Sequence, residues 1–524
     1  MKLWELTAVL CLIWALTLLY GEMLAFRLPS LSTCRWPHHS HSQSLDYVKV
    51  AVLTDPQLTD RTSLPLPPKS LALELVQFYS DLYMRRAFLS SVLPFDPDVI
   101  LFLGDYFDGG PYLSDHEWKE SLSRLKHIFS LSGQERHSTI PVYRIPGNHD
   151  IGYEFLHSRR PQAIRRYEKE FGSRNYQFTV GKVEFIAIDS QAIDGNPQGY
   201  LASSTRAFVK NVSLDVQAYP RVLLTHIPLY RQDGTDCGPN RKSEIINQRI
   251  NVHSPDIQEI VYQNYVTKES SNYLLDSIQP VLVLSGHDHD QCDVVHKSKY
   301  GPVKEHTLGT ISWQQGNVYP SFMLLSASNF VPSNTASSEE AVLTQLCFLP
   351  VQLHIYIWYL SLFVLTLLAL LLWPTGGVSF WHHFSDLMAF GKQLISSITS
   401  RPKEKDEDLN CEYEMMWDAE GSMQLVKKIS NVAVTSKSET SSVESRGTAV
   451  MRPTAIKNIS QELEVSVNAD ADAFDPMAKT LSRASKSWTK LVIQRLVRTF
   501  RMVTIIAAVN VPIYMLLLFK DWID

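Results

Sequence analysis

The chain has 524 residues and a formal net charge of −5, from 49 Lys and Arg against 54 Asp and Glu. Its length allows roughly two to four domains, and a hydrophobic fraction of 45% is ordinary for a folded core. The near-neutral charge gives no reason to expect nucleic acid as the main ligand. Six cysteines with no CxxC pair exclude a small disulfide scaffold and a zinc ribbon.

The N-terminal residues 1–46 are predicted to form a signal anchor and a linker. Leu6 to Tyr20 is almost wholly apolar, and no small-x-small cleavage pattern follows it closely. An uncleaved anchor is therefore the preferred interpretation, and a cleaved signal peptide is the alternative.

Residues 47–335 are predicted to form one lumenal α/β domain in which short apolar runs end at metal-type ligands. Leu71 to Val92 is predicted to be an intervening helix. Runs of four to six apolar residues between turn formers indicate buried strands. In open α/β sheets, ligands bind at the carboxyl ends of the strands. The five predicted strands and the polar residues that follow them are Val48–Leu53 with Asp55, Val99–Leu103 with Asp105, Val142–Ile145 with Asn148, His149 and Asp150, Arg221–Thr225 with His226, and Val281–Leu284 with His287 and His289.

The types of these residues suit two divalent cations. A dinuclear site needs a bridging carboxylate and a mixed shell of oxygen and imidazole ligands. A lone Asp after a strand is more often a turn residue or a helix cap, and a lone His is more often structural. Their joint appearance in order, each at a strand end, favours the metal interpretation.

Two further apolar stretches lie toward the C-terminus. Residues 347–373 are predicted to hold a transmembrane helix, because the 21 residues Leu353–Trp373 carry no charge and can cross a hydrocarbon core of about 30 Å. Residues 374–490 are predicted to be a cytosolic insert, partly disordered, with a possible hairpin at Cys411–Lys428. Residues 491–524 combine a basic amphipathic segment with a third predicted span, Met502–Phe519, for which a re-entrant or interfacial helix is the alternative.

Charge next to the spans predicts their orientation. Lys479–Arg501 contains seven basic and no acidic residues, which places this side in the cytosol and the region before Leu353 on the far side. Arg27 and Arg35 argue weakly the other way. The sequon at Asn211 would then face the lumen, and the one at Asn458 the cytosol.

The blocks Leu53-Thr54-Asp55, Gly104-Asp105, Gly147-Asn148-His149-Asp150, His226 and Gly286-His287-Asp288-His289 resemble those of the calcineurin-like metallophosphoesterases. That resemblance implies a two-sheet αββα sandwich with a dinuclear metal site, here with flanking transmembrane helices. A narrower set resembles the endoplasmic-reticulum metallophosphoesterases that remove ethanolamine phosphate from GPI-anchor mannoses and depend on manganese. The residues that carry this second resemblance are Arg85-Arg86-Ala87-Phe88, Gly104 to Gly109, Asn148 to Gly152, His226 to Arg231, Ser285-Gly286-His287 and Ser312-Trp313.

The resemblance implies a role for each block residue. Asp55 and His289 would bind one metal, Asn148, His226 and His287 the other, and Asp105 would bridge them. His149 would protonate the leaving oxygen, and Asp108 and Asp150 could orient histidines. The first block usually reads Asp-x-His, whereas here it reads Asp55-Pro56-Gln57. Gln57 can offer a carbonyl oxygen to Mn²⁺ or leave that position to water.

Other residues allow two interpretations. Arg231 could pair with a phosphate or be a surface charge, and Trp313 could line a sugar-binding cleft or belong to the core. His296 and His306 are predicted at the surface. Cys237 and Cys292 could form a disulfide in an oxidising lumen, with Cys34 and Cys347 a weaker second pair.

The expected function is a multi-pass phosphodiesterase of the endoplasmic reticulum or Golgi membrane, with two Mn²⁺ ions. Its expected partners are the membrane and GPI-anchored proteins or a lipid-linked glycan. One alternative is a related metallophosphatase for a phosphoprotein or a nucleotide. The other is an inactive phosphoesterase fold that acts as a binding protein, which Gln57 favours and the retention of Asp105 and His149 disfavours.

Overall fold

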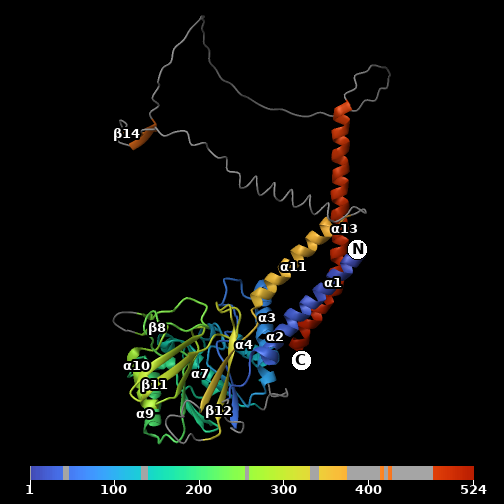
Figure 1. The fold of residues 1–524 in the computed structure, drawn as a ribbon. Coiled ribbons are helices and arrows are strands. Elements are labelled where there is room, and N and C mark those ends of the chain that lie inside the picture. Colours follow the sequence, from blue (N-terminus) through green and yellow to red (C-terminus); the bar gives the residue numbers. More distant parts are fainter. Residues whose placement is uncertain are drawn as a thin grey trace, which may run out of the picture. The chain divides into compact units, whose positions relative to one another are not determined.

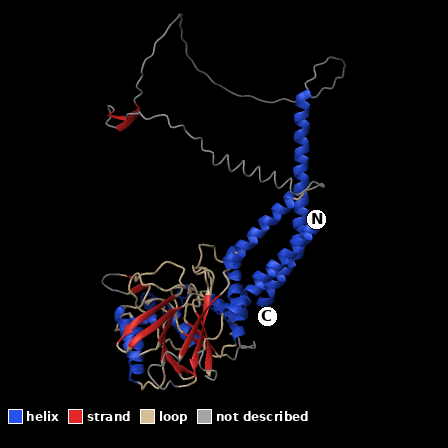
Figure 2. Cartoon of the chain, viewed as in Figure 1, coloured by secondary structure: helices blue, strands red, loops and turns tan. Residues whose placement is uncertain are grey.

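A computed structural model describes residues 2–38, 46–131, 140–253, 259–330, 341–374, 413–417, 423–427 and 476–523. The chain divides into two units, residues 1–371 with 496–524, and residues 372–495. The first unit contains two β-sheets covered by helices (Figures 1 and 2). In the second unit, β14 (Tyr413–Trp417) and β15 (Met423–Lys427) pair antiparallel within the predicted hairpin.

The first sheet has the strand order β13-β12-β1-β2-β3. Its central strands run parallel, with Val50 opposite Val99, and β12 and β13 add an antiparallel edge. Its strands are β1 (Tyr47–Leu53), β2 (Val99–Phe102), β3 (Val142–Arg144), β12 (Ser321–Ser328) and β13 (Val342–Phe348). Strand β13 lies beyond the predicted domain end at residue 335 and overlaps the predicted start of the membrane segment at 347. Its apolar side chains therefore extend the sheet and do not begin a helix.

The second sheet has the order β10-β11-β9-β6-β5-β4, and its middle strands β11, β9, β6 and β5 are parallel. Its strands are β4 (Tyr176–Val180), β5 (Val183–Ala187), β6 (Arg221–Leu224), β9 (Leu282–Ser285), β10 (Cys292–Ser298) and β11 (Gly301–Thr307). A separate short hairpin joins β7 (Ile250–Val252) to β8 (Ile260–Gln263).

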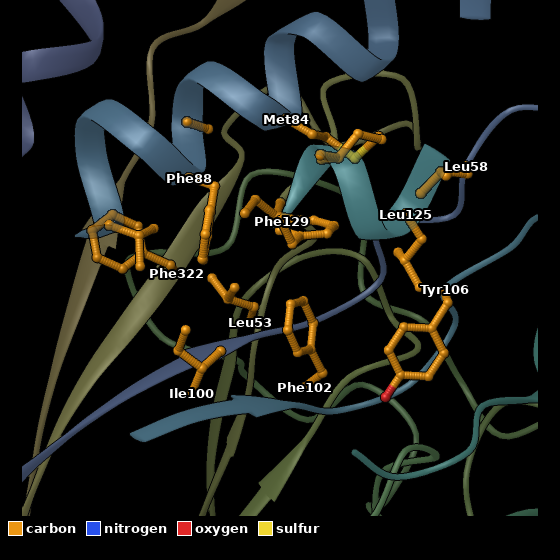
Figure 3. Close-up of a cluster of buried hydrophobic side chains, with 14 of the residues drawn as sticks. Leu53, Leu58, Met84, Phe88, Ile100, Phe102, Tyr106, Leu125, Phe129 and Phe322 are labelled. Carbon is orange, nitrogen blue, oxygen red and sulfur yellow. The ribbon is translucent and has the colours of Figure 1, made fainter. Parts of the chain in front are cut away.

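Side chains that alternate along the strands fill three apolar layers. Val50 and Val52 point into the space between the sheets, where they pack with Val222 and Leu224 of the second sheet. Their neighbour Leu53 faces the opposite way and joins an outer cluster with the helices (Figure 3). Because successive side chains of a strand point to opposite faces, a strand covered on both faces is apolar throughout. This confirms the predicted αββα sandwich.

Helices cover the outer face of each sheet. Those on the first sheet are α3 (Leu71–Arg86), α4 (Asp115–Ile128) and α7 (Pro161–Phe171), and those on the second are α9 (Tyr200–Leu214) and α10 (Lys268–Ile278). Side chains set their starts: Ser70 accepts a hydrogen bond from the Leu73 amide, and Ser114 and Glu117 form a capping box. Shorter helical segments are α2 (Ala25–Leu28), α5 (Asn148–Ile151), α6 (Glu154–Arg159), α8 (Ser190–Ile193), η1 (Tyr20–Leu24), η2 (Pro29–Thr33), η3 (Ala87–Val92), η4 (Leu93–Phe95) and η5 (Gly110–Tyr112).

Among the residues that the structure describes, three helical stretches are long and apolar enough to cross a membrane: Leu3–Thr33, Gln352–Leu372 and Thr489–Ile523. They contain α1 (Leu3–Leu19), α11 (Gln352–Leu372) and the C-terminal part of α13 (Pro476–Ile523). Trp14 donates to Thr366 at 3.0 Å, and Tyr359 donates to Glu22 at 2.8 Å, so α1 and α11 are antiparallel. Thr7 lies 3.2 Å from the Met502 sulfur, at the end of the bundle remote from Glu22.

Candidate functional site

The polar residues predicted at the strand ends come together at one edge of the two sheets. Asp55 follows β1, Asp105 follows β2, and Asn148 opens α5 directly after β3. From the second sheet, His226 follows β6, and His287 and His289 follow β9. Asp55, Asp105 and His226 are wholly buried. Parallel strands of both sheets thus deliver their ligands to one place.

These residues form two groups whose ligand atoms lie within 4.8 Å of one another: Asp105, His226 and His287, and Asp55, Asp105 and His289. Asp105 belongs to both groups, as a bridging carboxylate must. Its Oδ2 atom lies 3.1 Å from Nε2 of His226. The amide oxygen of Asn148 lies 3.1 Å from the same nitrogen.

Each of the three grouped histidines has one ring nitrogen against a backbone carbonyl. Nδ1 of His226 lies 2.7 Å from Leu103 O, and Nδ1 of His289 lies 3.0 Å from Gln315 O. Nε2 of His287 lies 3.1 Å from Gln263 O. A nitrogen that donates to a carbonyl leaves the other ring nitrogen with a lone pair, which is the form that binds a metal. The donor set therefore fits divalent cations.

Gln57 occupies the place of the usual first-block histidine. Its side chain is buried, and its terminal nitrogen lies 2.9 Å from both Asp105 Oδ2 and His289 Nε2. An amide oxygen and nitrogen are told apart only by their partners. Rotation of this amide by half a turn therefore offers an oxygen ligand at the same position.

The two carboxylates beside His149 have different tasks. Asp150 accepts hydrogen bonds from the backbone amides of Asp105, Tyr106 and Gly147 at 2.8–2.9 Å, so it holds the loop that carries Asp105. We predicted that Asp150 orients a histidine, but its carboxylate binds these backbone amides instead. Asp108 does contact one: its backbone carbonyl lies against Nδ1 of His149, and its carboxylate lies 3.6 Å from the same atom.

Several residues at the site have left-handed backbones that non-glycine residues rarely adopt. They are Asp55 (φ 49°), Gln57 (φ 38°), Asp105 (φ 55°), His287 (φ 69°) and His289 (φ 64°). Such conformations cost free energy and persist where the surrounding fold imposes them. Here they turn side chains that are two positions apart in one loop, such as Asp55 and Gln57 or His287 and His289, toward the same point.

Burial and neighbouring charges shift the pKa values at the site. Burial lowers the pKa of His287 to about 3, so this ring is neutral. Burial also raises the pKa of Asp150 to about 7, with a further contribution from Asp105. For Asp105, burial is outweighed by His226 and His149, which hold its pKa well below the usual range. Asp105 is therefore charged.

Comparison with known proteins agrees with this geometry. Residues 48–291 match the family model described as calcineurin-like phosphoesterase. This domain is a calcineurin-like metallophosphoesterase. The match covers all five ligand-bearing strand ends, so the chain contains a metal-dependent phosphoesterase domain with membrane-type helices on either side.

Three curated relatives are similar over half to about two thirds of the chain. Cell division control protein 1 of Saccharomyces cerevisiae is 26% identical over 373 residues, which cover 68% of this chain and 72% of that protein. The Metallophosphoesterase 1 homolog of Drosophila melanogaster is 26% identical over an alignment that covers 65% of this chain and 86% of that protein. Metallophosphoesterase 1 of Rattus norvegicus is 29% identical over an alignment that covers 50% of this chain and 68% of that protein.

Solved structures align more weakly. A purple acid phosphatase from yellow lupin (Lupinus luteus) is 12% identical with a TM-score of 0.33, over 56% of this chain and 51% of that chain. A phosphopantetheinyl hydrolase from Mycobacterium tuberculosis is 12% identical with a TM-score of 0.28, over 50% and 90%.

Arg231 of the metallophosphoesterase domain is neither a free phosphate ligand nor a surface charge. It is buried, lies 3.2 Å from Asp288 and stacks 4.3 Å from the centre of the Tyr265 ring. Arg241 makes a second pair with Asp288 through two contacts of 2.9 Å. Both arginines therefore fix the loop between His287 and His289.

Disulfides join both predicted cysteine pairs in the metallophosphoesterase unit. Cys237 is bonded to Cys292, which ties the Arg241 loop to β10, and Cys34 is bonded to Cys347 in β13. The histidines predicted at the surface are instead partly buried. His296 lies 2.7 Å from the buried Glu305, and His306 lies 2.6 Å from Asp293.

Sequence reasoning missed the groups that orient the ligands. The carbonyls of Leu103, Gln263 and Gln315 carry no side-chain signal, so no pattern could reveal them. Arg241 lies four residues after Cys237, and recognition of the Cys237–Cys292 bond would have placed it near Asp288.

Proposed function

We propose that this chain is a membrane-bound, dinuclear phosphodiesterase that removes ethanolamine phosphate from a GPI-anchor mannose in the endoplasmic reticulum or Golgi. The observation that carries the proposal is the shared position of Asp105 in two ligand groups, with the His149 backbone amide 2.8 Å from its carboxylate. The GPI substrate rests on the sequence blocks that resemble the GPI-remodelling enzymes.

The proposed ligands are Asp55, Gln57, Asp105 and His289 for one cation, and Asp105, Asn148, His226 and His287 for the other. When bound, two such cations, for which we propose Mn²⁺, activate water near neutral pH and polarise the phosphoryl oxygens. The mixture of carboxylate, amide and imidazole donors suits this ion. Asp150 holds the bridging loop in place through the three backbone amides described above.

His149 is the proposed proton donor. Partial burial lowers its pKa, but the charge of Asp105 and the carbonyl of Asp108 outweigh that effect and raise the pKa above its ordinary value. With Nδ1 engaged by Asp108, the proton available to a substrate is on Nε2. The side chain is 37% exposed, so a leaving oxygen can reach it. A sugar alkoxide is strongly basic and needs such a proton as it departs.

A cavity next to this proton donor supports a glycan leaving group. It has a volume of about 480 Å³, and its lining includes Asp108, Trp313, Gln314, Asn317 and Thr59. Amide and hydroxyl groups around an aromatic face suit a sugar, which has both polar edges and apolar faces. Trp313 also packs edge-on against Tyr356 of α11 at 5.8 Å. The cavity continues to Gln352, at the first turn of that helix.

Two independent features support a lumenal catalytic domain. Both disulfides lie in the unit that holds the metal site, and such bonds persist in oxidising compartments. Arg498 and Arg501 lie near Met502 and Thr7, at the end of the helix bundle remote from Glu22. Basic residues favour the cytosolic end of a span, which puts the domain on the other side.

Mass spectrometry of GPI glycans tests the proposal. Cells that lack the protein should retain ethanolamine phosphate on a mannose, and wild-type protein should remove it again. His149→Ala, expressed at the same level, should not restore removal. An unchanged glycan profile in the deficient cells would contradict the proposed substrate. Purified protein that cleaves a phosphoprotein or a nucleotide instead would favour the alternative hydrolase.

A further inference from the structure

Two adjacent arginines at the end of α3, Arg85 and Arg86, belong to neither metal-ligand group, yet both are buried. A buried charge is costly unless other groups neutralise it and accept its hydrogen bonds. The partners of these two arginines therefore show what the pair does. Apart from His127 of α4, the partners described below come from outside the αββα sandwich.

Arg86 binds two of the three membrane-type helical stretches. Its guanidinium pairs with the buried carboxylate of Glu22, in the stretch that continues α1. It also lies 3.1 Å from the carboxylate of Asp521 and donates to the carbonyl of Leu517 at 2.7 Å, both in α13. Arg85 donates to the backbone carbonyl of Asp521 at 2.5 Å and to that of His127 in α4.

The positive charge and the N–H donors of the two arginines suit the C-terminal end of α13. The last carbonyls of a helix have no partners within the helix, and the helix dipole places negative charge there. Arg85 satisfies a carbonyl of this last turn, that of Asp521, and Arg86 binds the carbonyl of Leu517 one turn earlier. Aromatic contacts surround them, with Phe78 of α3 5.2 Å and His127 4.7 Å from the ring of Trp522. Glu22 also accepts from Tyr359 of α11, so the third helix joins the same cluster.

We propose that Glu22, Arg85, Arg86 and Asp521 form a junction that positions the metal site relative to the membrane helices. Arg86 is a positioning residue in this account, since it touches neither the ligands nor the cavity. The junction would set how far from the bilayer a phosphodiester must lie to reach His149. The inference rests on the proposed function only in taking the physiological substrate to be membrane-borne.

Helix α3 provides the physical link from the junction to the site. Gln77 of α3 donates to the carbonyl of Thr59 at 3.1 Å, and Asp81 of α3 binds Arg124, which donates to the same carbonyl at 3.0 Å. The next residue, Asp60, accepts from the amide of Gly109 at 2.8 Å, adjacent to Asp108. A shift of α3 would therefore move the cavity wall at Thr59 and the support of His149.

Hydrogen exchange of the full chain in lipid nanodiscs tests the junction without any substrate. Asp521→Asn removes the charge at nearly constant shape, and Lys520→Gln, at an exposed neighbouring position, is the matched control. We expect amides in the last turn of α3 to exchange at least about tenfold faster in Asp521→Asn and at the wild-type rate in Lys520→Gln. Asp521→Glu, which keeps the charge, should restore part of the protection. Unchanged exchange in Asp521→Asn would overturn the junction.

Activity on two diesters tests its positioning role. The probes are bis(4-nitrophenyl) phosphate in solution and a 4-nitrophenyl phosphodiester of a dialkylglycerol in phosphatidylcholine vesicles. Asp521→Asn should lower turnover of the vesicle-borne diester by about tenfold and change that of the soluble one by less than about twofold. Equal losses on both would show that the junction only stabilises the fold. A wild-type protein that hydrolyses neither diester would contradict the proposed phosphodiesterase activity. The hydrogen-exchange measurement needs no substrate, so it would still test whether the junction exists.

Discussion

The terminal amide of Gln57 lies 2.9 Å from the carboxylate of Asp105, the residue shared by both ligand groups. A histidine is usual at this position in the family that the sequence resembles. Gln57→His should therefore alter metal preference or affinity, with the softer imidazole favouring zinc over manganese. Hydrolysis should not depend on Gln57→His, because we expect the wild-type protein to be active already. Titration of the metal-free protein with Mn²⁺ and Zn²⁺, followed by hydrolysis assays, measures both effects. A wild-type protein that is inert and becomes active in Gln57→His would show that the natural chain is a binding protein.

His149→Ala should separate chemistry from metal binding. The ring of His149 is engaged through Nδ1 by Asp108, and it is absent from both metal-ligand groups. Its loss should lower cleavage of an alkyl phosphodiester by about 10²-fold or more, and that of a nitrophenyl ester distinctly less, because nitrophenolate leaves without a proton. The metal content should stay at the wild-type level. Equal losses on both esters together with missing metal would mean that His149 is structural.

Gly286→Ala should damage the site through one added methyl group. A Cβ atom at Gly286 would lie 2.7 Å from Oδ2 of Asp55 and even closer to the Thr54 hydroxyl, and both residues are wholly buried. Overpacking of this kind costs about 1–3 kcal/mol of folding stability. We expect weaker metal binding with a moderate fall in thermal stability. Unchanged metal affinity, measured by titration, would show that Asp55 can move without losing its role.

Glycosylation of Asn211 tests the proposed orientation. Asn211 is exposed in the last turns of α9, whereas Asn458 lies outside the described residues. The wild-type protein should lose mass on endoglycosidase treatment, and Asn211→Gln should abolish that shift while Asn458→Gln leaves it intact. A shift that survives Asn211→Gln but disappears in Asn458→Gln would place the metallophosphoesterase domain in the cytosol.

The sequence alone predicted what depends on local pattern. Apolar runs such as Val48–Leu53 alternate between two buried faces, and each polar residue that follows a run comes to the shared edge of the sheets. That information lies in consecutive residues. The spatial gathering of Asp55, Asp105 and His226 followed from it directly, whereas the αββα architecture was implied by the resemblance to the calcineurin-like metallophosphoesterases.

Contacts between distant segments could not be predicted in this way. Asp150 has the composition of a residue that orients a histidine, yet it binds backbone amides on a loop that is 44 or 45 residues earlier in the chain. No pattern in the sequence around Arg231 indicated that Asp288 would neutralise its charge. The contact between Arg86 and Asp521 spans 435 residues, so no sequence window contains both. Strand β13 was missed because its apolar residues run close to those of α11.

The central claim is that one carboxylate, Asp105, serves two cations. The most direct test is the metal content of purified wild-type and Asp105→Asn protein, measured by plasma mass spectrometry together with hydrolysis of an aryl phosphodiester. We predict close to two Mn²⁺ ions per wild-type chain, and a clear loss of metal with nearly complete loss of hydrolysis in Asp105→Asn, because a bridging ligand touches both ions. Full metal content with full activity in Asp105→Asn would contradict the dinuclear site.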